Sequence, residues 1–364
     1  MAAKKKTSEG LTPLDQIQSY LKDHKDEHLN FDKECDYSVS SGSLLLDIEM
    51  SGGIRPSMIR ASGVSEGGKT SCALSFAKNF QETVENGMVI YIKAEGRLTP
   101  EMLERSGLDV SPEKLLIYKS NVYESVMTLM RELILDNPTD CKYFFVIDSM
   151  DALVPKKDLE KGFHEAEKVA GGSLLTSTFL KRMALAMTSK GHICFLISQV
   201  RSKVSVNQYE KTDPKLTNAS GGNALLHYSD WILEFQPRYG ADTIPPKTTD
   251  KPEGHYCKII FRKTANEKTG TLVRYPIKYG RTGGRSIWIE YEVIDMLLQW
   301  KMADAKGAWI IIAEELIKEL KDAGFEMEPK HQGMDNFRKY LEKEQEICQY
   351  LFSKLKNALQ GISK

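Results

Sequence analysis

The segment Gly63–Thr70, which reads GVSEGGKT, constrains the fold of this 364-residue chain more than any other part of its sequence. It fits the pattern GxxxxGK[ST], it follows the β-rich run MIRAS, and it precedes the helical pattern SCALSFAKNF. In such a setting the glycines let the backbone curl, so that successive N–H groups point at phosphate oxygens, and the new helix adds the positive end of its dipole. The sequence therefore predicts a strand, a phosphate-binding loop (P-loop) and a helix in succession.

The residue types in this loop suit ATP and Mg²⁺. Lys69 is expected to reach the β- and γ-phosphates, and the Thr70 hydroxyl is expected to hold Mg²⁺. Asp148 closes the apolar run FFVID, where a parallel strand meets the ligand crevice, and is the expected second Mg²⁺ ligand. The alternatives are a chance Gly-rich turn and an Asp that only caps the next turn. The predicted ATP-binding residues of the loop are Gly63, Val64, Ser65, Glu66, Gly67, Gly68, Lys69, Thr70 and Ser71.

Short β-rich runs alternate with helical patterns in the middle of the chain, which is typical of a parallel α/β sheet. The strand candidates are residues 57–62, 88–94, 114–120, 143–149 and 193–198, and the helix candidates are residues 71–85, 100–106, 123–135 and 172–190. After Asp230 we expect three antiparallel strands at one sheet edge, in the runs WILEF, YCKIIF and VRYPIKY. From about Trp300 we expect helices, the strongest in AWIIIAEELIKEL and YLEKEQEICQYLFSKLKNAL.

Three parts are expected along the chain. Residues 1–38 form an N-terminal segment with a short amphipathic helix at Leu14–Leu21. Residues 39–290 form an α/β core, in which a mostly parallel sheet is flanked by helices. Residues 291–364 form a small helical C-terminal domain.

Composition narrows the class of protein. Lys plus Arg and Asp plus Glu both number 50, so any nucleic-acid surface must be local and not a global field. The six cysteines show no CxxC pair and no metal-ligand spacing. The start MAAKKKTSEG has no apolar run behind its lysines, and no stretch approaches about 18 uninterrupted apolar residues. We therefore expect a cytoplasmic protein with reduced cysteines and without a membrane span.

Four segments resemble the parts of the RecA family of recombinases that carry its ATP chemistry. The approach to the family's P-loop resembles SSGSLLLDIEMSGGIRPSMIRASGVSEGGKT, and the family's magnesium-binding strand resembles VIDSMDAL, with matches at Asp148 and Ser149. The family segment with the catalytic glutamate is similar to AEGRLTPEMLERSGLD and matches Glu95. By position alone, Glu95 is as readily a surface or capping residue. The strand before the family's γ-phosphate-sensing glutamine is similar to FLISQVRSKV and matches Gln199.

Two further segments extend the resemblance toward the C-terminus. The end of the family's second DNA-binding loop resembles SGGNALLHYSDWILEF, and the hinge into the small domain of bacterial-type RecA is similar to DMLLQWKMADAKGAW. The resemblance thus runs, with gaps, from about residue 40 to the end, and GGNAL is its most discriminating element. It implies a P-loop NTPase core of RecA type, with ATP and Mg²⁺ as cofactors, in a divergent member of bacterial or phage type.

The resemblance also implies two DNA-binding loops, at about residues 154–172 and 200–222. A loop longer than about 12–15 residues within a compact domain is usually functional or disordered. The second loop continues directly from Gln199, so a basic segment tied to a phosphate sensor can bind DNA phosphates when ATP holds it in place. For the first loop a solvated charged loop is the alternative, and for Tyr209 an incidental loop aromatic. The expected DNA-binding residues are Arg182, Arg201, Lys203, Tyr209, Gly221, Gly222 and Asn223.

The sequence departs from the family around the nucleotide. Family members complete the ATP site with two basic residues of the neighbouring protomer; Lys263 matches the first, Ala265 stands at the second, and Lys268 is the expected substitute. Met102 occupies the place of a tyrosine that stacks on adenine. Lys93 replaces an acid two residues before Glu95, and an ammonium there is expected to favour the charged carboxylate.

The implied function is that of an ATP-dependent DNA recombinase that forms a helical filament on single-stranded DNA and pairs it with a homologous duplex. The expected catalytic residues are Glu95, Lys69 and Gln199, and DNA is expected to stimulate hydrolysis. The stretch 14–40 is the candidate for docking onto the neighbouring protomer, with a merely local helix as the alternative. Two other functions stay open: a hexameric motor or helicase, and a regulatory ATPase that binds a protein.

Overall fold

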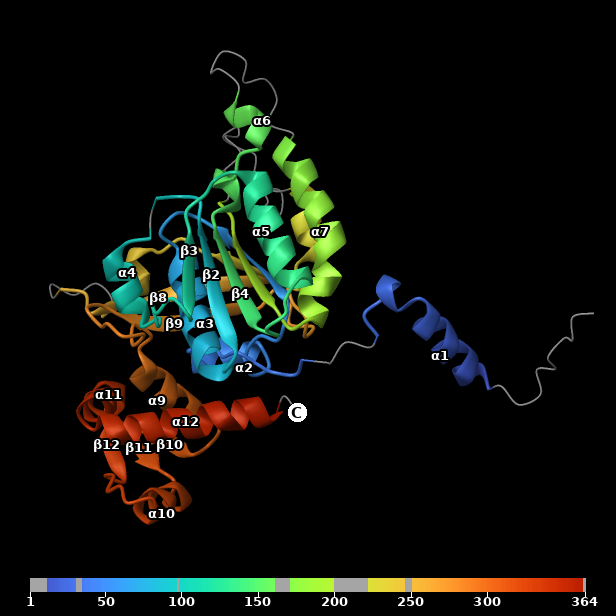
Figure 1. Ribbon diagram of the computed structural model, residues 1–364. Helices are drawn as coiled ribbons and strands as arrows, with labels where there is room; N and C mark the ends of the chain where they lie inside the picture. The colour runs from blue at the N-terminus through green and yellow to red at the C-terminus, as the bar shows by residue number, and fades with distance from the viewer. Residues whose placement is uncertain are drawn as a thin grey trace, which may run out of the picture.

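The computed structural model describes residues 12–30, 35–96, 98–160, 171–199, 222–245 and 251–362; for residues 171–173, 222, 223 and 362 it describes the backbone alone. Within these ranges nine strands form one sheet in the order β3-β2-β4-β5-β1-β6-β8-β7, with β9 paired to β8 (Figure 1). The first six are β1 Met58–Gly63, β2 Gly87–Lys93, β3 Leu115–Tyr118, β4 Lys142–Asp148, β5 Ile193–Ile197 and β6 Trp231–Phe235. The last three are β7 Thr243–Ile244, β8 Gly254–Lys263 and β9 Leu272–Lys278.

Strands β1 to β6 pair in parallel, and β7, β8 and β9 pair antiparallel. The five strands predicted before residue 200 are therefore confirmed. The run WILEF forms β6, which the sequence predicts as an antiparallel strand. The prediction is correct for the pairing with β8 but wrong for the pairing with β1, which is parallel. The mostly parallel sheet with an antiparallel edge is the fold class that the sequence predicts.

Helices cover both faces of this sheet (Figure 1). On one face lie α3 Lys69–Thr83 and α4 Pro100–Ser106, and on the other lie α5 Tyr123–Leu135, α7 Gly171–Ser189 and α8 Gly222–Tyr228. The strand YFFVID shows why both faces must be covered, because its side chains alternate. Phe144 and Val146 enter the core on the α3 side, whereas Phe145 and Ile147 enter the core on the α5 and α7 side.

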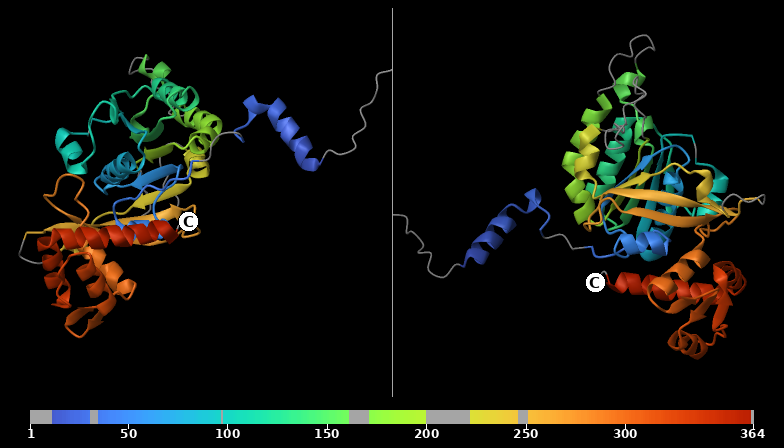
Figure 2. Two further views of the ribbon diagram at one scale, coloured as in Figure 1. Left: turned by 60° about the horizontal axis from the view of Figure 1, so that its bottom comes forward. Right: turned by 180° about the vertical axis from the view of Figure 1, so that it is seen from behind.

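The C-terminal elements form a third hydrophobic cluster beneath the sheet (Figure 2). They are α9 Ile289–Gln299, β10 Ala303–Lys306, β11 Trp309–Ile312, α10 Glu314–Asp322, β12 Lys330–Gln332, α11 Gly333–Lys343 and α12 Gln345–Ile362. The short helix α2, Leu44–Glu49, joins this cluster to the core through the buried Leu44.

The two strongest helix predictions in this C-terminal region are each confirmed in part, since α10 covers EELIKEL and α11 and α12 cover most of the second run. The run WIII is strand β11 in a three-stranded antiparallel sheet, because its β-branched residues alternate: Ile310 and Ile312 are buried and Trp309 is exposed. The helix predicted over YLEKEQEICQYLFSKLKNAL is interrupted at Glu344, where α11 ends and α12 begins.

The helix α1, Pro13–Asp23, confirms the amphipathic helix predicted near the N-terminus, and Figures 1 and 2 show it away from the sheet. Thr12 caps it, and none of its residues is buried. Its apolar side chains Leu14, Ile17 and Tyr20 are 62%, 56% and 59% exposed. No helix within the described ranges combines the length and the apolar character needed to cross a membrane.

Candidate nucleotide site

The P-loop joins the end of β1 to the start of α3 and needs glycine where it turns. Gly63 and Gly68 have φ angles of 133° and 103°, which side chains rarely adopt. A Cβ on Gly63 would lie 2.2 Å from the carbonyl oxygen of Phe235 on β6, so the neighbouring strand also excludes a side chain. Gly68 is the N-cap of α3, which leaves the first N–H groups of this helix directed at the loop.

Lys69 lies buried at the first turn of α3. Its Nζ donates hydrogen bonds to the carbonyl oxygens of Gly63, at 2.9 Å, and Val64, at 2.6 Å. The ammonium group is thus folded back over the loop that precedes it. It stands where the positive end of the helix and the loop N–H groups converge, which is the place that the sequence predicts for a phosphate-binding lysine.

The next residue, Thr70, contacts the expected Mg²⁺ ligand at the end of β4. Thr70 Oγ1 donates to Asp148 Oδ2 at 2.8 Å, and the Tyr91 hydroxyl donates to the same oxygen at 2.6 Å. Asp148 and Tyr91 are both buried. Burial, together with the charge of Asp148, raises the pKa of Tyr91, so its hydroxyl stays a proton donor. Sequence reasoning missed Tyr91; the available signal was a hydroxyl in an otherwise apolar strand, which needs a partner when buried.

Glu95 lies just beyond the end of β2 and receives donors from two other strand ends. The Ser149 hydroxyl donates to Glu95 Oε1, and Gln199 Nε2 donates to the same oxygen at 3.1 Å. The backbone N–H of Gln199 in turn donates to Asp151 Oδ2 at 2.7 Å. The carboxyl ends of β2, β4 and β5 therefore meet beside the P-loop, where ligands bind in open parallel sheets.

The side chain of Lys93 contacts the backbone of the segment before α4. Its Nζ donates to the carbonyl oxygen of Leu98 at 2.8 Å, so its ammonium is bound to the segment that leads into α4. Below the site, Arg60 Nε donates to Ser198 Oγ at 3.1 Å, and burial lowers the pKa of this guanidinium.

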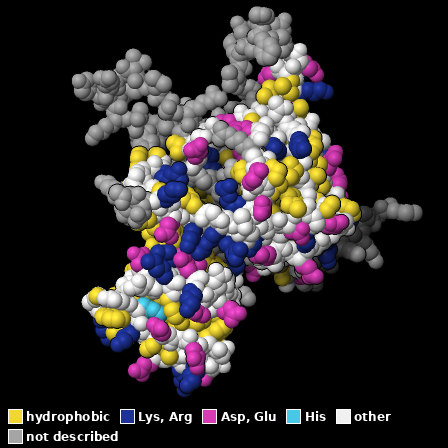
Figure 3. Space-filling view, turned by 90° about the vertical axis from the view of Figure 1, so that its left-hand side faces the viewer, with side chains coloured by type: hydrophobic (Ala, Val, Ile, Leu, Met, Phe, Trp, Pro, Cys, Tyr) yellow, Lys and Arg dark blue, Asp and Glu magenta, His cyan; other side chains and the backbone are white. Residues whose placement is uncertain are grey.

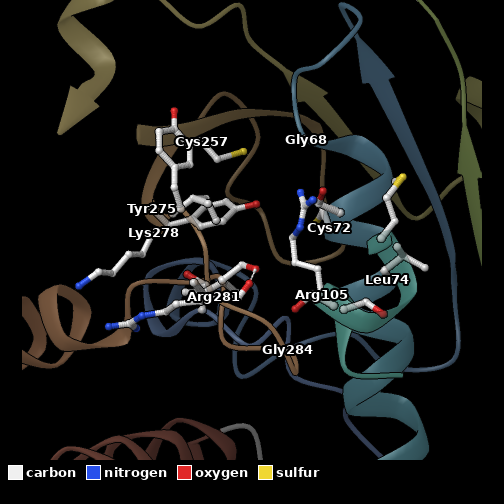
Figure 4. A pocket seen from close by; sticks show the side chains of 18 of the residues that line it. Gly68, Cys72, Leu74, Arg105, Cys257, Tyr275, Lys278, Arg281 and Gly284 are labelled. Atoms are coloured by element: carbon white, nitrogen blue, oxygen red, sulfur yellow. Dashed lines mark hydrogen bonds between the residues drawn. The ribbon is translucent and has the colours of Figure 1, made fainter. Parts of the chain in front are cut away.

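A cavity of about 610 Å³ opens beside the P-loop, between α3, α4 and the end of β9 (Figure 4). Gly68 and Ser71 line it at the phosphate end, and Met102 lines it from α4. Arg105 points into it, across from Tyr275 (Figure 4). Basic side chains gather on this side of the molecule, between the core and the C-terminal elements (Figure 3). The basic residues that line the cavity are Arg105, Arg238, Lys278 and Arg281.

The two lysines expected to serve a neighbouring protomer lie outside this cavity. Lys263 Nζ donates to the carbonyl oxygens of Leu226, at 3.1 Å, and His227, at 2.9 Å. Lys268 Nζ pairs with Glu49 at 3.0 Å and donates to the carbonyl of Ile48 at 3.1 Å. Both lysines therefore bind groups of their own chain.

The structure describes three of the seven predicted DNA-binding residues. Arg201, Lys203, Tyr209 and Gly221 lie outside the described residues, as do residues 161–170 of the first loop. Gly222 and Asn223 begin α8, for which the backbone is described at these positions. Arg182 is exposed on α7.

A strand, a P-loop and a helix, with an acidic residue at the end of a neighbouring parallel strand, define the P-loop NTPase class of α/β protein. Comparison with known families narrows this class: the family model described as RecA N-terminal domain matches residues 18–276. The chain belongs to the RecA family.

Relatives over almost the whole length carry the same family name at low identity. The chain is 27% identical to "Protein RecA" of Listeria seeligeri over 352 residues, which covers 94% of this chain and 88% of that protein. It is 28% identical to "Protein RecA" of Listeria ivanovii over 333 residues, which covers 90% and 82%. The resemblance found in the sequence is therefore confirmed, and the chain is a divergent member.

Proposed function

We propose that this chain is an ATP-dependent DNA recombinase, which forms a helical filament on single-stranded DNA in the cytoplasm and pairs that strand with a homologous duplex. ATP hydrolysis, stimulated by DNA, resets the filament. The contact between Gln199 and Glu95 carries the proposal, because Gln199 directly precedes the long basic segment 200–222. One side chain thus touches the ATP site and begins the segment expected to bind DNA.

The P-loop is the proposed site for the phosphates of ATP. Lys69 exchanges its bonds to the Gly63 and Val64 carbonyls for bonds to phosphate oxygens, and the N–H groups at the start of α3 add donors. Thr70 and Asp148 fit Mg²⁺, because a hydroxyl and a carboxylate supply the hard oxygen atoms that this ion prefers. The bound ion would neutralise charge on the β- and γ-phosphates.

Glu95 is the proposed base that accepts a proton from the attacking water. Its Oε1 accepts hydrogen bonds from Gln199 and Ser149. When Gln199 turns toward the γ-phosphate, one of these two bonds breaks and the carboxylate gains accepting capacity for water. Sensing of the phosphate and activation of the base then depend on the same movement.

The cavity beside the P-loop is the proposed place of the base and ribose. Met102 lines it with a flexible, polarisable thioether, which makes favourable contacts with aromatic rings. An aromatic side chain at this position would offer a larger stacking surface. Recognition of the base is therefore expected to be weaker than with tyrosine.

DNA binding is assigned to segment 200–222 and to its neighbourhood. Basic side chains bind the phosphates, and Tyr209 offers a ring on which a base can stack. Arg182 adds a cation on the exposed side of α7. The proposed contacts are Arg182, Arg201, Lys203, Tyr209, Gly221, Gly222 and Asn223.

Filament formation is assigned to α1 and to the two lysines. The exposed Leu14, Ile17 and Tyr20 make an apolar stripe at helical spacing, which a neighbouring protomer can cover. To reach the ATP of the next protomer, Lys263 would leave its two carbonyl partners, and Lys268 would leave the carbonyl of Ile48 and the carboxylate of Glu49.

The direct test is electron microscopy of the full chain with single-stranded DNA, ATP and Mg²⁺, followed by a homologous pairing assay with a supercoiled duplex. We expect regular filaments and ATP-dependent joint molecules, and neither with Lys69→Ala. Unwinding of a forked duplex without pairing would instead support a motor. One observation favours a regulatory ATPase: Lys268 is paired with Glu49 of its own chain. ATP binding without filaments or DNA binding would support that alternative.

A further inference from the structure

The hydroxyl of Tyr91 donates a hydrogen bond to the carboxylate of Asp148 inside the core. Tyr91 is not among the site residues predicted from the sequence. Tyr91 is 1% exposed, and its hydroxyl lies 2.6 Å from Asp148 Oδ2. Thr70 Oγ1 donates to the same oxygen at 2.8 Å. Two donors from different elements, β2 and α3, therefore converge on one atom of the carboxylate at the end of β4.

The position of Tyr91 is set by the sheet and not by the P-loop. Strand β2 pairs with β3 on one side and with β4 on the other, and Tyr91 stands opposite Val146, two residues before Asp148. Its ring lies in the hydrophobic cluster on the α3 side. Its hydroxyl is thus held by packing that does not depend on a bound nucleotide.

Thr70 alone is a poor anchor for the carboxylate. The torsion that turns an Asp carboxylate is broad and two-fold, so hydrogen bonds decide its orientation. Thr70 is itself an expected Mg²⁺ ligand, and its hydroxyl must serve the ion as well as Asp148. A donor fixed elsewhere is needed to keep the carboxylate in one orientation while Thr70 changes its contacts.

We propose that Tyr91 is a positioning residue for Mg²⁺, which fixes the carboxylate of Asp148 through its hydroxyl so that the ion binds with the nucleotide at low concentration. Oδ2 receives both donors, and Oδ1 receives neither of them. Partners that orient a metal ligand typically change metal affinity by about 10- to 100-fold when they are removed. This inference rests on the proposed binding of ATP and Mg²⁺ at the P-loop.

The test is Tyr91→Phe, which removes the hydroxyl and keeps the ring. Equilibrium binding of a fluorescent, slowly hydrolysed ATP analogue is measured across a series of free Mg²⁺ concentrations, with an EDTA baseline. We expect the half-saturating Mg²⁺ concentration to rise about tenfold. The affinity in EDTA is expected to stay within about twofold of the wild type, because the hydroxyl does not touch the P-loop backbone.

A matched control is available in Tyr123→Phe. Tyr123 is also buried, and its hydroxyl also donates to an oxygen, Thr176 Oγ1, at 2.6 Å, but it lies on α5 on the other side of the sheet. Its Mg²⁺ curve should follow the wild type, while thermal unfolding of both variants reports the cost of losing a buried hydrogen bond.

Two results overturn the inference while leaving the proposed function intact. In the first, Tyr91→Phe follows the wild-type Mg²⁺ curve. In the second, both tyrosine variants shift by the same factor, which would show a general loss of packing. A wild-type chain that binds the analogue without any dependence on Mg²⁺ would contradict the proposed function itself.

Discussion

Gln199 Nε2 donates to Glu95 Oε1 at 3.1 Å, and this bond joins the end of β5 to the end of β2 across the end of β4. The two residues are 104 positions apart in the sequence. Because Ser149 donates to the same oxygen, three strand ends are tied at one carboxylate. A change in the position of Gln199 therefore changes both the environment of Glu95 and the start of segment 200–222.

Removing the carboxylate of Glu95 tests its role as the base. We expect Glu95→Gln to lower the rate of ATP hydrolysis by about 10²- to 10⁴-fold, the range that general-base catalysis contributes. Nucleotide affinity should stay close to the wild type, because the substitution leaves Lys69 and Thr70, the residues expected to bind the phosphates and Mg²⁺, in place. Steady-state hydrolysis and fluorescent-nucleotide binding are the two measurements. Unchanged hydrolysis would remove Glu95 from the mechanism.

The ammonium of Lys69 is expected to carry much of the affinity for the phosphates. A hydrogen bond to a charged group contributes about 1.5–3 kcal/mol, so Lys69→Ala should weaken ATP binding by roughly 10- to 100-fold. A suitable control is Lys354→Ala on α12, whose ammonium pairs with Glu319 at 2.7 Å, away from the P-loop. Titration calorimetry with ATP and Mg²⁺ checks both variants. Equal affinities in the two would contradict the phosphate site.

Protomer association should depend on the apolar stripe of α1. Replacing Leu14, Ile17 and Tyr20 together by serine should abolish filaments, as seen by sedimentation and electron microscopy. Nucleotide binding by the isolated chain should not change, because no residue of α1 is buried. Filaments of normal length from the triple variant would show that α1 is a local helix without a role in assembly.

The buried carboxyl group of Glu292, which lies on α9 and faces the start of α2, is expected to make the free energy of unfolding depend on pH. Burial raises the pKa of Glu292 to about 8, although Ser43 and the backbone N–H of Leu44 donate to it, and Asp47 and Asp295 add to the rise. Because this pKa lies above the unfolded value of 4.5, the stabilisation is complete below about pH 4.5 and is lost as the pH rises through about 8.

The variant Glu292→Gln stays neutral and should lose this dependence. Between pH 6 and pH 9 the free energy of unfolding of the wild type should fall by up to about 3 kcal/mol more than that of the variant. Urea unfolding at both pH values measures the difference, with the exposed Glu346→Gln on α12 as control. Parallel pH profiles for all three proteins would show that Glu292 is charged throughout.

The central fold could be predicted from the sequence because its signals are local. The sequence predicts both boundaries of the helices at Pro100–Ser106 and Tyr123–Leu135. The first helix starts at a Pro that follows the capping residue Thr99, and the second shows apolar residues at helical spacing. The run WIII could not be assigned in this way, because a short apolar run suits a buried helix or a strand equally until its partner strands are known. In the structure, pairing with β10 and β12 makes this run a strand.

The site residues that belong to a motif, or that match the family, could be predicted from the sequence. The residues that reach the site only through contacts across the sheet could not. Lys69, Thr70 and Asp148 lie together as the sequence predicts. Tyr91 was missed, and the contact of Ser149 with Glu95 was not predicted, because no spacing in the sequence shows which hydroxyl will face which carboxylate. The acceptor of Lys93, a backbone carbonyl in the next segment, was hidden for the same reason.

The most direct test of the account is the rate of ATP hydrolysis with and without single-stranded DNA, for the wild type and for Gln199→Ala. We expect DNA to raise the wild-type rate severalfold and the variant to lose this stimulation while it still binds ATP. That result would support a switch in which Gln199 connects the nucleotide to segment 200–222. Hydrolysis that ignores DNA in the wild type, or a variant that is stimulated as strongly as the wild type, would contradict it.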